Sequence, residues 1–458
     1  MSTVVLDGCA VVTMDGQRSE YTTGHVVVTD NVITAVGSGS PPPASLAGAA
    51  DGKAVTRIDA GGCLATPGLI NTHHHLYQWG TRGLAADAAL FEWLTQLYPV
   101  WARMDADIVG ALATGGLAVL AKSGCSTTMD HHYVFPRSGG DVLGATIAAA
   151  RQVGLRFHPT RGSMDLGASA GGLPPDDVVE DRDAILLASK AAIEEFHDAS
   201  PQSMLRIGLA PCSPFSVTRE LLSEAADLAR RAQVRLHTHL AETAEENYYC
   251  AEHFGCTPAE YLDSLGWLGD DVWLAHGVYL DDAAISRLAA TGTGVAHCPS
   301  SNGRLGAGIC RTHDLLAAGV PVGLGVDGAA SNEESSLIGE VRQATLIARS
   351  AGGPRALSVR QALALATIGG ARLLGRDQEI GSLETGKLAD IALWRLDTLA
   401  HAGIADPVAA LVLGSRPPLE LLLVNGATIV AQDRLVTAEE EQVAADSQAA
   451  AAALTEGR

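Results

Sequence analysis

The sequence is poor in aromatic residues and has no long apolar run. Phe, Trp and Tyr make up only 4% of the 458 residues, so a large core must rely on aliphatic packing. No segment reaches the roughly 18 unbroken apolar residues of a membrane helix. The first residues lack the basic and apolar stretches of a signal peptide. We therefore expect no membrane partner and a cytoplasmic location.

Basic residues and paired cysteines are also scarce. Lys and Arg number 31 against 52 Asp and Glu, which gives a formal net charge of −21. A surface of this charge repels phosphates, so we expect no nucleic-acid partner. The 8 Cys are scattered without a CxxC pair, which indicates reduced, mostly buried thiols rather than disulfides or a zinc knuckle.

Two β-rich ends surround a different middle. Residues 1–64 contain short β-branched runs separated by turn residues, with a hairpin turn near Asp30, and residues 376–436 have the same texture. We expect both segments to form one small β-sandwich. A barrel over residues 65–375 would lie between them, and residues 437–458 would form a helical tail.

The middle alternates short β-rich runs with longer helical patterns, as a repeated β/α unit does. Eight runs qualify as strands, the number that a TIM (β/α)8 barrel needs. The competing α/β architecture is a doubly wound open sheet, but no GxGxxG motif at a strand-to-helix turn favours it. The expected strands cover residues 65–75, 126–132, 156–160, 205–211, 235–239, 272–276, 294–299 and 322–327.

Polar residues stand at the carboxyl ends of several of these strands. In a barrel these ends converge on the face that carries active sites. The residues concerned are His73, His75, His239, His276 and Asp327.

His73 and His75 form an HxH motif in NTHHHLYQ. Residues two apart on a strand point to the same side, so both can bind one ion while His74 points away. An isolated HxH is more often an ordinary pair of histidines. Further candidate ligands at later strand ends favour a metal site here.

The segments HTHLAET and GLGVDG add further candidates. Glu242 follows His239 by three residues and suits proton transfer beside a metal. His237 lies one layer deeper, so we expect a core residue rather than a ligand. Asp327 could cap the following helix, but an ionised carboxylate after an apolar strand is costly unless it is paired or bound to metal.

Five segments in this order and spacing resemble the amidohydrolase superfamily, and more narrowly its cytosine/guanine deaminase and chlorohydrolase branch. They are TPGLINTHHHLYQ, HTHLAET, AHGVY, HCPSSN and GLGVDG. The flanking β-segments, including GSLETGKLADIALW, fit the composite sandwich of that family. The resemblance covers nearly the whole chain and implies a metal-dependent aminohydrolase on a TIM barrel.

Position by position, the resemblance implies four metal ligands and three catalytic residues. Glu242 would transfer protons, His276 would lie beside the metal-bound water or polarise the reacting carbon, and Asp327 would both bind metal and accept a proton. The implied ligands are His73, His75, His239 and Asp327.

The resemblance also bears on the number of metal ions. Many dinuclear relatives use a carboxylated lysine at the end of strand four, and LRIGLAPCSPF contains no lysine. We therefore expect one Zn²⁺ per subunit, with Fe²⁺ as the alternative because nitrogen and oxygen ligands accept either ion.

The segment after the first strand is dense in aromatics and is expected to fold over the barrel mouth. We expect Gln78, His131 and Asn302 to lie within reach of a small heterocyclic substrate. Together with LFEWLTQLYPVWARM and DHHYVFP, these features resemble 8-oxoguanine deaminases, which implies conversion of 8-oxoguanine to uric acid and ammonia. The alternatives are a guanine or isoxanthopterin/pterin deaminase and a hydroxyatrazine-type amino- or chlorohydrolase.

A scaffold that has lost catalysis is less consistent with the sequence, because every expected ligand and Glu242 are present. Apolar barrel helices such as VGALATGGLAVLA could provide an interface, so we expect a homo-oligomer.

Overall fold

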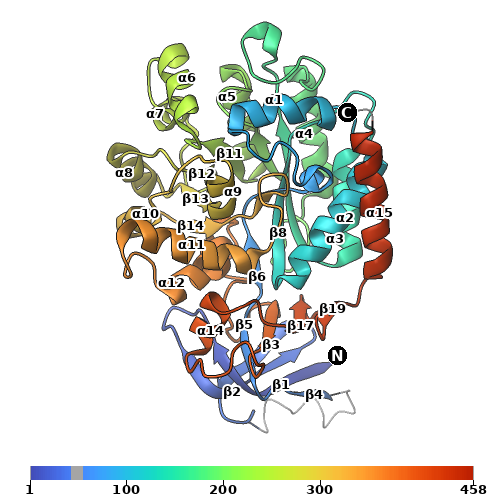
Figure 1. Cartoon of the computed structure of the whole chain (residues 1–458), viewed down its shortest axis with the longest axis vertical. Helices are drawn as coiled ribbons and strands as arrows, with labels where there is room; N and C mark the ends of the chain where they lie inside the picture. The colour runs from blue at the N-terminus through green and yellow to red at the C-terminus, as the bar shows by residue number, and fades with distance from the viewer. Residues whose placement is uncertain (1, 43–54, 457–458) are drawn as a thin grey trace.

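Strands from both ends of the chain meet in one sheet below a closed barrel (Figure 1). The computed structural model describes residues 2–42 and 55–456. Residues 43–54 of the first expected segment and 457–458 of the expected tail lie outside the described part.

The sheet of the two chain ends has nine strands in the order β19-β18-β17-β16-β5-β1-β2-β3, with β4 paired to β1. The strand β5 pairs antiparallel with β16, and this pairing joins the two halves. The nine strands are β1 (Thr3–Val12), β2 (Glu20–Thr29), β3 (Val32–Ser38), β4 (Val55–Asp59), β5 (Cys63–Pro67), β16 (Ile391–Arg395), β17 (Leu419–Val424), β18 (Ala427–Ala431) and β19 (Arg434–Leu435).

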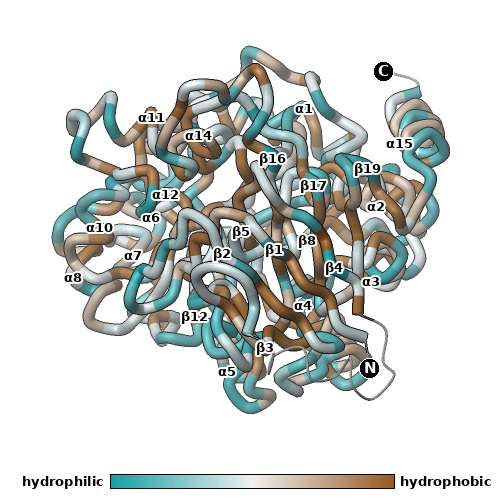
Figure 2. The backbone as a smooth tube through the Cα atoms, turned by 90° about the horizontal axis from the view of Figure 1, so that it is seen from below, coloured by the Kyte–Doolittle hydropathy of each residue, from teal (hydrophilic) through white to brown (hydrophobic). Residues whose placement is uncertain are grey.

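Local sequence accounts for the shape of this sheet. The hairpin between β2 and β3 turns at Asp30, whose φ of 55° is left-handed as a tight hairpin turn requires. Alternate apolar residues such as Leu6, Ile33, Ile391 and Leu423 form the core of the sheet. Figure 2 shows the apolar strands of this sheet from below.

The barrel confirms the expected eight parallel strands. Their closed order is β10-β11-β12-β13-β14-β6-β8-β9. They are β6 (Leu69–Asn71), β8 (Cys125–His132), β9 (Arg156–Ser163), β10 (Gly208–Pro211), β11 (Leu236–Leu240), β12 (Val272–His276), β13 (Gly294–His297) and β14 (Val322–Leu324).

The first expected strand, residues 65–75, is not one element. Its start belongs to β5 in the end sheet, and the chain enters the barrel at Gly68, where a Cβ would contact the Ser126 side chain 2.5 Å away. Its end forms the short strand β7 (His74–His75). The last expected strand is also interrupted, and its final residue begins β15 (Asp327–Gly328), which pairs with β7.

Helices surround the barrel, and many begin at a side chain that caps them. The carboxylate of Asp105 and the hydroxyl of Thr218, for example, accept backbone N–H groups in the first turns of their helices. The helices of the first half are η2 (Leu76–Thr81), α1 (Leu90–Trp101), α2 (Ala106–Lys122), α3 (Val142–Val153), η3 (Ala168–Ala170), α4 (Arg182–Phe196), α5 (Arg219–Ala232), α6 (Ala244–Phe254) and α7 (Pro258–Ser264).

The second half continues the same pattern and ends on a helix that returns to the barrel. Its helices are α8 (Asp282–Thr291), α9 (Pro299–Arg304), α10 (Thr312–Ala318), α11 (Leu337–Gly352), α12 (Val359–Ala364), the π-helical η4 (Leu365–Gly369), α13 (Gly370–Leu373), α14 (Pro407–Leu413) and α15 (Glu440–Thr455).

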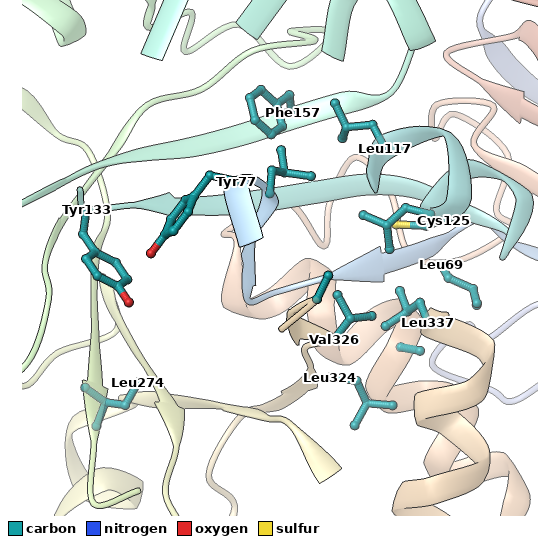
Figure 3. Packing of buried hydrophobic residues seen from close by; sticks show 14 of the residues in the cluster. Leu69, Tyr77, Leu117, Cys125, Tyr133, Phe157, Leu274, Leu324, Val326 and Leu337 are labelled. Atoms are coloured by element: carbon teal, nitrogen blue, oxygen red, sulfur yellow. The ribbon is translucent and has the colours of Figure 1, made fainter. Parts of the chain in front are cut away.

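The main core is aliphatic with a few aromatic residues, as the composition requires. Figure 3 shows part of it. Leu69 of β6, Leu324 of β14 and Leu337 of α11 are buried there together with Val326, which follows β14. No helix in the described ranges is long and apolar enough to cross a membrane.

The apolar helix α2 is covered within its own chain. It packs against α3 and α15 (Figure 1). Ser447 of α15 donates a hydrogen bond to the carbonyl of Ala111 on α2. The segment VGALATGGLAVLA, which we expect to be able to form an oligomer interface, lies in α2, and α15 covers one side of this helix.

Candidate active site

The barrel mouth brings together all five polar residues that the sequence placed at strand ends. His73, His75, His239, His276 and Asp327 are each 8% exposed or less. His73 follows β6, His239 lies in β11, and His276 ends β12. Strand alternation holds as expected, because His74 turns instead toward the carbonyl oxygen of Asp327.

The imidazole rings meet around one carboxylate. The Nε2 atoms of His73 and His75 lie 3.2 Å and 3.3 Å from Oδ1 of Asp327. The Nε2 atoms of His75 and His239 are 3.1 Å apart. His73 Nε2 is buried and makes no hydrogen bond of good geometry. The three Nε2 atoms and the carboxylate oxygen are therefore close together, and His73 Nε2 lacks a hydrogen-bond donor or acceptor of good geometry among them.

Backbone carbonyls determine which ring nitrogens of His75 and His239 carry a proton. His75 Nδ1 lies 2.7 Å from the carbonyl of His131, and His239 Nδ1 lies 2.6 Å from that of Cys212. A carbonyl only accepts hydrogen bonds, so each Nδ1 must be the donor. Both Nε2 atoms then bear lone pairs, and two lone pairs 3.1 Å apart repel unless a cation lies between them.

His73 is oriented by a second histidine. His237 donates from Nδ1 to the carbonyl of Trp273 at 2.8 Å, so its Nε2 is the acceptor for His73 Nδ1, also at 2.8 Å. This leaves the lone pair of His73 on Nε2. Burial lowers the pKa of His73 well below its ordinary value and that of His237 to about 3, so both rings are neutral.

These donors fit a divalent metal ion. Three neutral imidazoles and one carboxylate are a ligand set that zinc accepts. Two overlapping groups of possible ligands occur among the described residues: His73 with His276 and Asp327, and His73 with His75, His131 and His239. His237 supports His73 rather than joining the cluster, in line with its expected core position.

Asp327 remains ionised at the centre of this cluster. Burial raises the pKa of its carboxyl, but the neighbouring histidines, among them His276, whose own pKa is raised, outweigh that effect and lower it well below its usual range. Its Oδ2 accepts a 2.6 Å hydrogen bond from the Ser301 hydroxyl. Its φ of 60° is left-handed, a strained conformation of the kind that collects at functional sites.

Glu242 lies beside His276 above the cluster. Its Oε2 is 3.5 Å from His276 Nε2, whose ring is held by a 3.0 Å hydrogen bond from Nδ1 to Asn302. Burial, opposed by His276 and reinforced by Asp327, raises the pKa of Glu242 to about 7. A carboxyl of this pKa can give and take a proton near neutral pH.

A small cavity adjoins Glu242, His276 and Asp327. Aromatic and aliphatic side chains form its walls, several of them from α1, so part of the segment expected to cover the mouth does so. Besides the cluster residues, its lining consists of Gln78, Leu90, Trp93, Leu94, Tyr98, Tyr133, Cys212, Phe215, Leu305 and Ser331.

Of the three residues expected to contact substrate, Gln78 lines the cavity and its Oε1 is buried without a hydrogen-bond partner. His131 and Asn302 are not part of the lining. His131 is stacked on His239 with ring centroids 4.7 Å apart, and its Nε2 donates to the carbonyl of Ala210. Asn302 holds His276.

The sequence interpretation missed two buried carboxylates that hold loops of the site. Glu246 accepts from the backbone amides of Ala241 and Glu242. Glu340 accepts hydrogen bonds from the backbone amide of Ser300 at 3.1 Å and from the side-chain amide of Asn332 at 2.9 Å. The spacing of Glu246, one helical turn after Glu242, was the only signal for the first, and nothing local marks the second.

A closed (β/α)8 barrel with buried histidines and carboxylates at its mouth is typical of barrel enzymes whose site can hold a metal ion. The model of the Amidohydrolase family matches residues 64–429, and the chain belongs to this family.

Two curated relatives and one solved structure illustrate the similarity. An 8-oxoguanine deaminase of Pseudomonas aeruginosa is 43% identical over 95% of each chain. An isoxanthopterin deaminase from an unknown prokaryotic organism is 37% identical, over 89% of this chain and 86% of the relative. A zinc-bound atrazine chlorohydrolase of Arthrobacter aurescens has a TM-score of 0.92 and 34% identity, over 98% of this chain and all of that one. These findings confirm the expected class, an aminohydrolase acting on carbon–nitrogen bonds.

Proposed function

We propose that this protein deaminates an amino-substituted purine-like ring and that its substrate is 8-oxoguanine, converted with water to uric acid and ammonia. The observation that carries the proposal is the position of Glu242, with its pKa near 7, at a cavity shared with the ionised Asp327. The 43% identity to an 8-oxoguanine deaminase over nearly the whole chain favours this ring.

We further propose that one divalent ion, Zn²⁺ or Fe²⁺, is held by His73, His75, His239 and Asp327. When bound, such an ion lowers the pKa of a water molecule toward 7. The lone pairs directed at one point and the lack of a lysine in β10 support a single ion.

The residues of the chain then divide the proton transfers. Asp327, kept ionised by its neighbours, accepts a proton from the attacking water as the bond to the amino-bearing carbon forms. Glu242 in its protonated form donates to the adjacent ring nitrogen, which prevents negative charge from building up on the ring. His276, fixed by Asn302, lies between both carboxylates at 3.5 Å and 3.9 Å and can hydrogen-bond the developing oxyanion. Asp327 then passes its proton to the amino group, the carbon–nitrogen bond breaks and ammonia leaves, while Glu242 regains a proton from the hydroxyl as the new carbonyl forms.

The lining of the cavity suits a planar heterocycle with hydrogen-bonding groups along its edge. Trp93, Tyr98, Tyr133 and Phe215 supply an aromatic wall. The buried carboxamide of Gln78 offers both a donor and an acceptor, which matches the edge of an oxopurine.

The test measures the amine that zinc-loaded protein releases, which is ammonia from 8-oxoguanine, guanine and isoxanthopterin and an alkylamine from hydroxyatrazine. We expect kcat/KM for 8-oxoguanine to exceed that for guanine by about a hundredfold, or roughly 2.7 kcal/mol of transition-state binding. Preference for isoxanthopterin or hydroxyatrazine would replace the substrate and keep the reaction class, since both kinds of relative are similar to this chain. Release of neither ammonia nor alkylamine from any of the four by metal-loaded protein would contradict the proposal.

A further inference from the structure

Glu246 is a buried carboxylate whose hydrogen bonds go to the backbone of the catalytic turn. It is the third residue of α6 and is completely buried. One oxygen accepts from the Ala241 amide at 2.8 Å and the other from the Glu242 amide at 3.0 Å. Within the described ranges, its hydrogen bonds go to these two amides, and no arginine or lysine is among the groups that shift its pKa. Burial of a carboxylate whose only hydrogen-bond partners are backbone amides costs folding free energy. We therefore expect Glu246 to have a function that this position serves.

This contact differs from an ordinary helix cap. A glutamate at the third helical position normally reaches back to the amide of the residue that caps the helix. The capping residue here, Thr243, makes no capping hydrogen bond. The Glu246 carboxylate passes this residue and binds the two amides before it, so it restrains the turn that leads out of β11.

The turn is strained and is held from both sides. Ala241 has a φ of 52°, a left-handed conformation that is unfavourable for a residue with a Cβ. Its amide is bound by Glu246, and its carbonyl accepts a 2.9 Å hydrogen bond from the Tyr279 amide. The turn therefore keeps one conformation, in which the Glu242 carboxylate lies 3.5 Å from His276.

We propose that Glu246 is a positioning residue for catalysis, which fixes the backbone of Ala241 and Glu242 so that the Glu242 carboxyl faces the reacting atoms. This inference rests on the proposed role of Glu242. It assigns Glu246 no contact with substrate or metal.

The first test compares Glu246→Gln with Glu245→Gln. The glutamine keeps the shape of the side chain but faces one of the two amides with its own NH₂ group, so one hydrogen bond is lost. Glu245 lies in the same helical turn, is exposed and undergoes the same change from carboxyl to carboxamide. We expect kcat to fall by about 10- to 100-fold in Glu246→Gln, as misplacement of a catalytic group by about 1 Å does, with KM and metal content within about twofold of wild type.

A double substitution separates positioning from general stability. If Glu246 acts through Glu242, then Glu246→Gln adds no further loss of kcat in a Glu242→Gln background. The proposal would be overturned if the losses of kcat in the two single variants multiplied in the double variant. It would also be overturned if Glu246→Gln were as active as Glu245→Gln. If Glu246→Gln does not fold, Glu246→Asp keeps the charge but cannot reach both amides, and the same comparison applies.

A crystal structure of Glu246→Gln provides a readout that does not depend on turnover. Ala241 should leave the left-handed region and the distance from Glu242 to His276 should exceed 3.5 Å. An unchanged turn would refute the positioning role even if the wild-type enzyme proved inactive on all four heterocycles, a result that by itself would refute only the proposed function.

Discussion

At the scale of single residues, the candidate site depends on which nitrogen of each histidine carries a proton. The lone pairs of His73, His75 and His239 all face the centre because their other nitrogens donate to fixed acceptors. For two of the rings the acceptor is a backbone carbonyl. For His73 it is the side chain of His237, so this contact can be removed by substitution.

We expect His237→Phe to weaken metal binding. The phenyl ring fills the space beside Trp273 but cannot accept the proton of His73 Nδ1, so His73 is no longer held in the tautomer that binds metal. Loss of such an outer partner typically lowers metal affinity by about 10- to 100-fold. Competition with a chelator measures the affinity directly.

The matched control is His253→Phe, because His253 is exposed on α6 and donates only to the carbonyl of Tyr249. Equal affinities in the two variants would show that His237 merely fills the core.

Glu242 can be tested separately from the metal. We expect Glu242→Gln to lower kcat by about 10²- to 10⁴-fold, because the amide cannot transfer a proton to the ring. Metal content should stay at the wild-type level, since Glu242 is not among the proposed ligands. Element analysis of the purified variant beside its steady-state kinetics checks both statements. Turnover close to wild type would remove Glu242 from the mechanism.

At the scale of elements, local pattern predicts the strands well and their interruptions poorly. The apolar runs that became β8, β11 and β12 are recognisable within a few residues of their ends. The first and last barrel strands were expected to continue through His75 and Asp327. They break because their ends pair with each other as β7 and β15 across the mouth, and such a pairing leaves no local signal.

The contact between α2 and α15 is also decided by elements far apart in the chain. Gly115 lies where α2 approaches both α15 and η2. A Cβ there would overlap the Ser447 hydroxyl and lie 2.8 Å from the Trp79 indole nitrogen. A glycine in the middle of a helix is therefore retained for close packing.

We expect Gly115→Leu to destabilise the protein by about 1–3 kcal/mol, the usual cost of overpacking a close contact. Gly110→Ala, on the same helix, is the control. Its Cβ would meet only the Cβ of Ala145 at 3.7 Å, so helix propensity should make it neutral or stabilising by up to about 1 kcal/mol. Chemical denaturation of both variants measures the difference. A Gly115→Leu protein as stable as wild type would show that α15 yields to the added side chain.

At the scale of the whole molecule, buried carboxyl groups link stability to pH. Burial raises the pKa of Glu242 and Glu246 to about 7 and that of Glu340 to about 8, against 4.5 for a free glutamate. The folded state therefore holds these protons more tightly than the unfolded state. Their contribution to stability is complete below about pH 4.5 and is lost as the pH rises through 7 to 8.

Glu340→Gln isolates one of these contributions. Between pH 5 and pH 8.5 we expect wild type to lose more free energy of unfolding than the variant, by on the order of a few kcal/mol. Denaturation at several pH values measures the difference between the two proteins. The exposed Glu195 on α4 provides the control, because Glu195→Gln should follow the wild-type curve. Parallel curves for wild type and Glu340→Gln would contradict the raised pKa of Glu340.

Much of the candidate site could be predicted because its residues occupy regular local positions. His73 and His75 share one side through strand alternation, and strand ends in a barrel meet at one face. The positions of His131 and Asn302 could not be predicted in this way. His131 Nε2 donates to the carbonyl of Ala210 and Asn302 Oδ1 accepts from His276 Nδ1, and both partners belong to other elements of the barrel.

The sequence by itself therefore determined the barrel, the order of its strands and the residues at their carboxyl ends, because each of these depends on patterns a few residues long. Only the tertiary structure decided the joining of the two chain ends through β5 and β16, the support of His73 by His237 and the restraint of the catalytic turn by Glu246. These features depend on hydrogen bonds and packing between side chains and backbone groups whose alignment exists only once the chain has closed into the barrel.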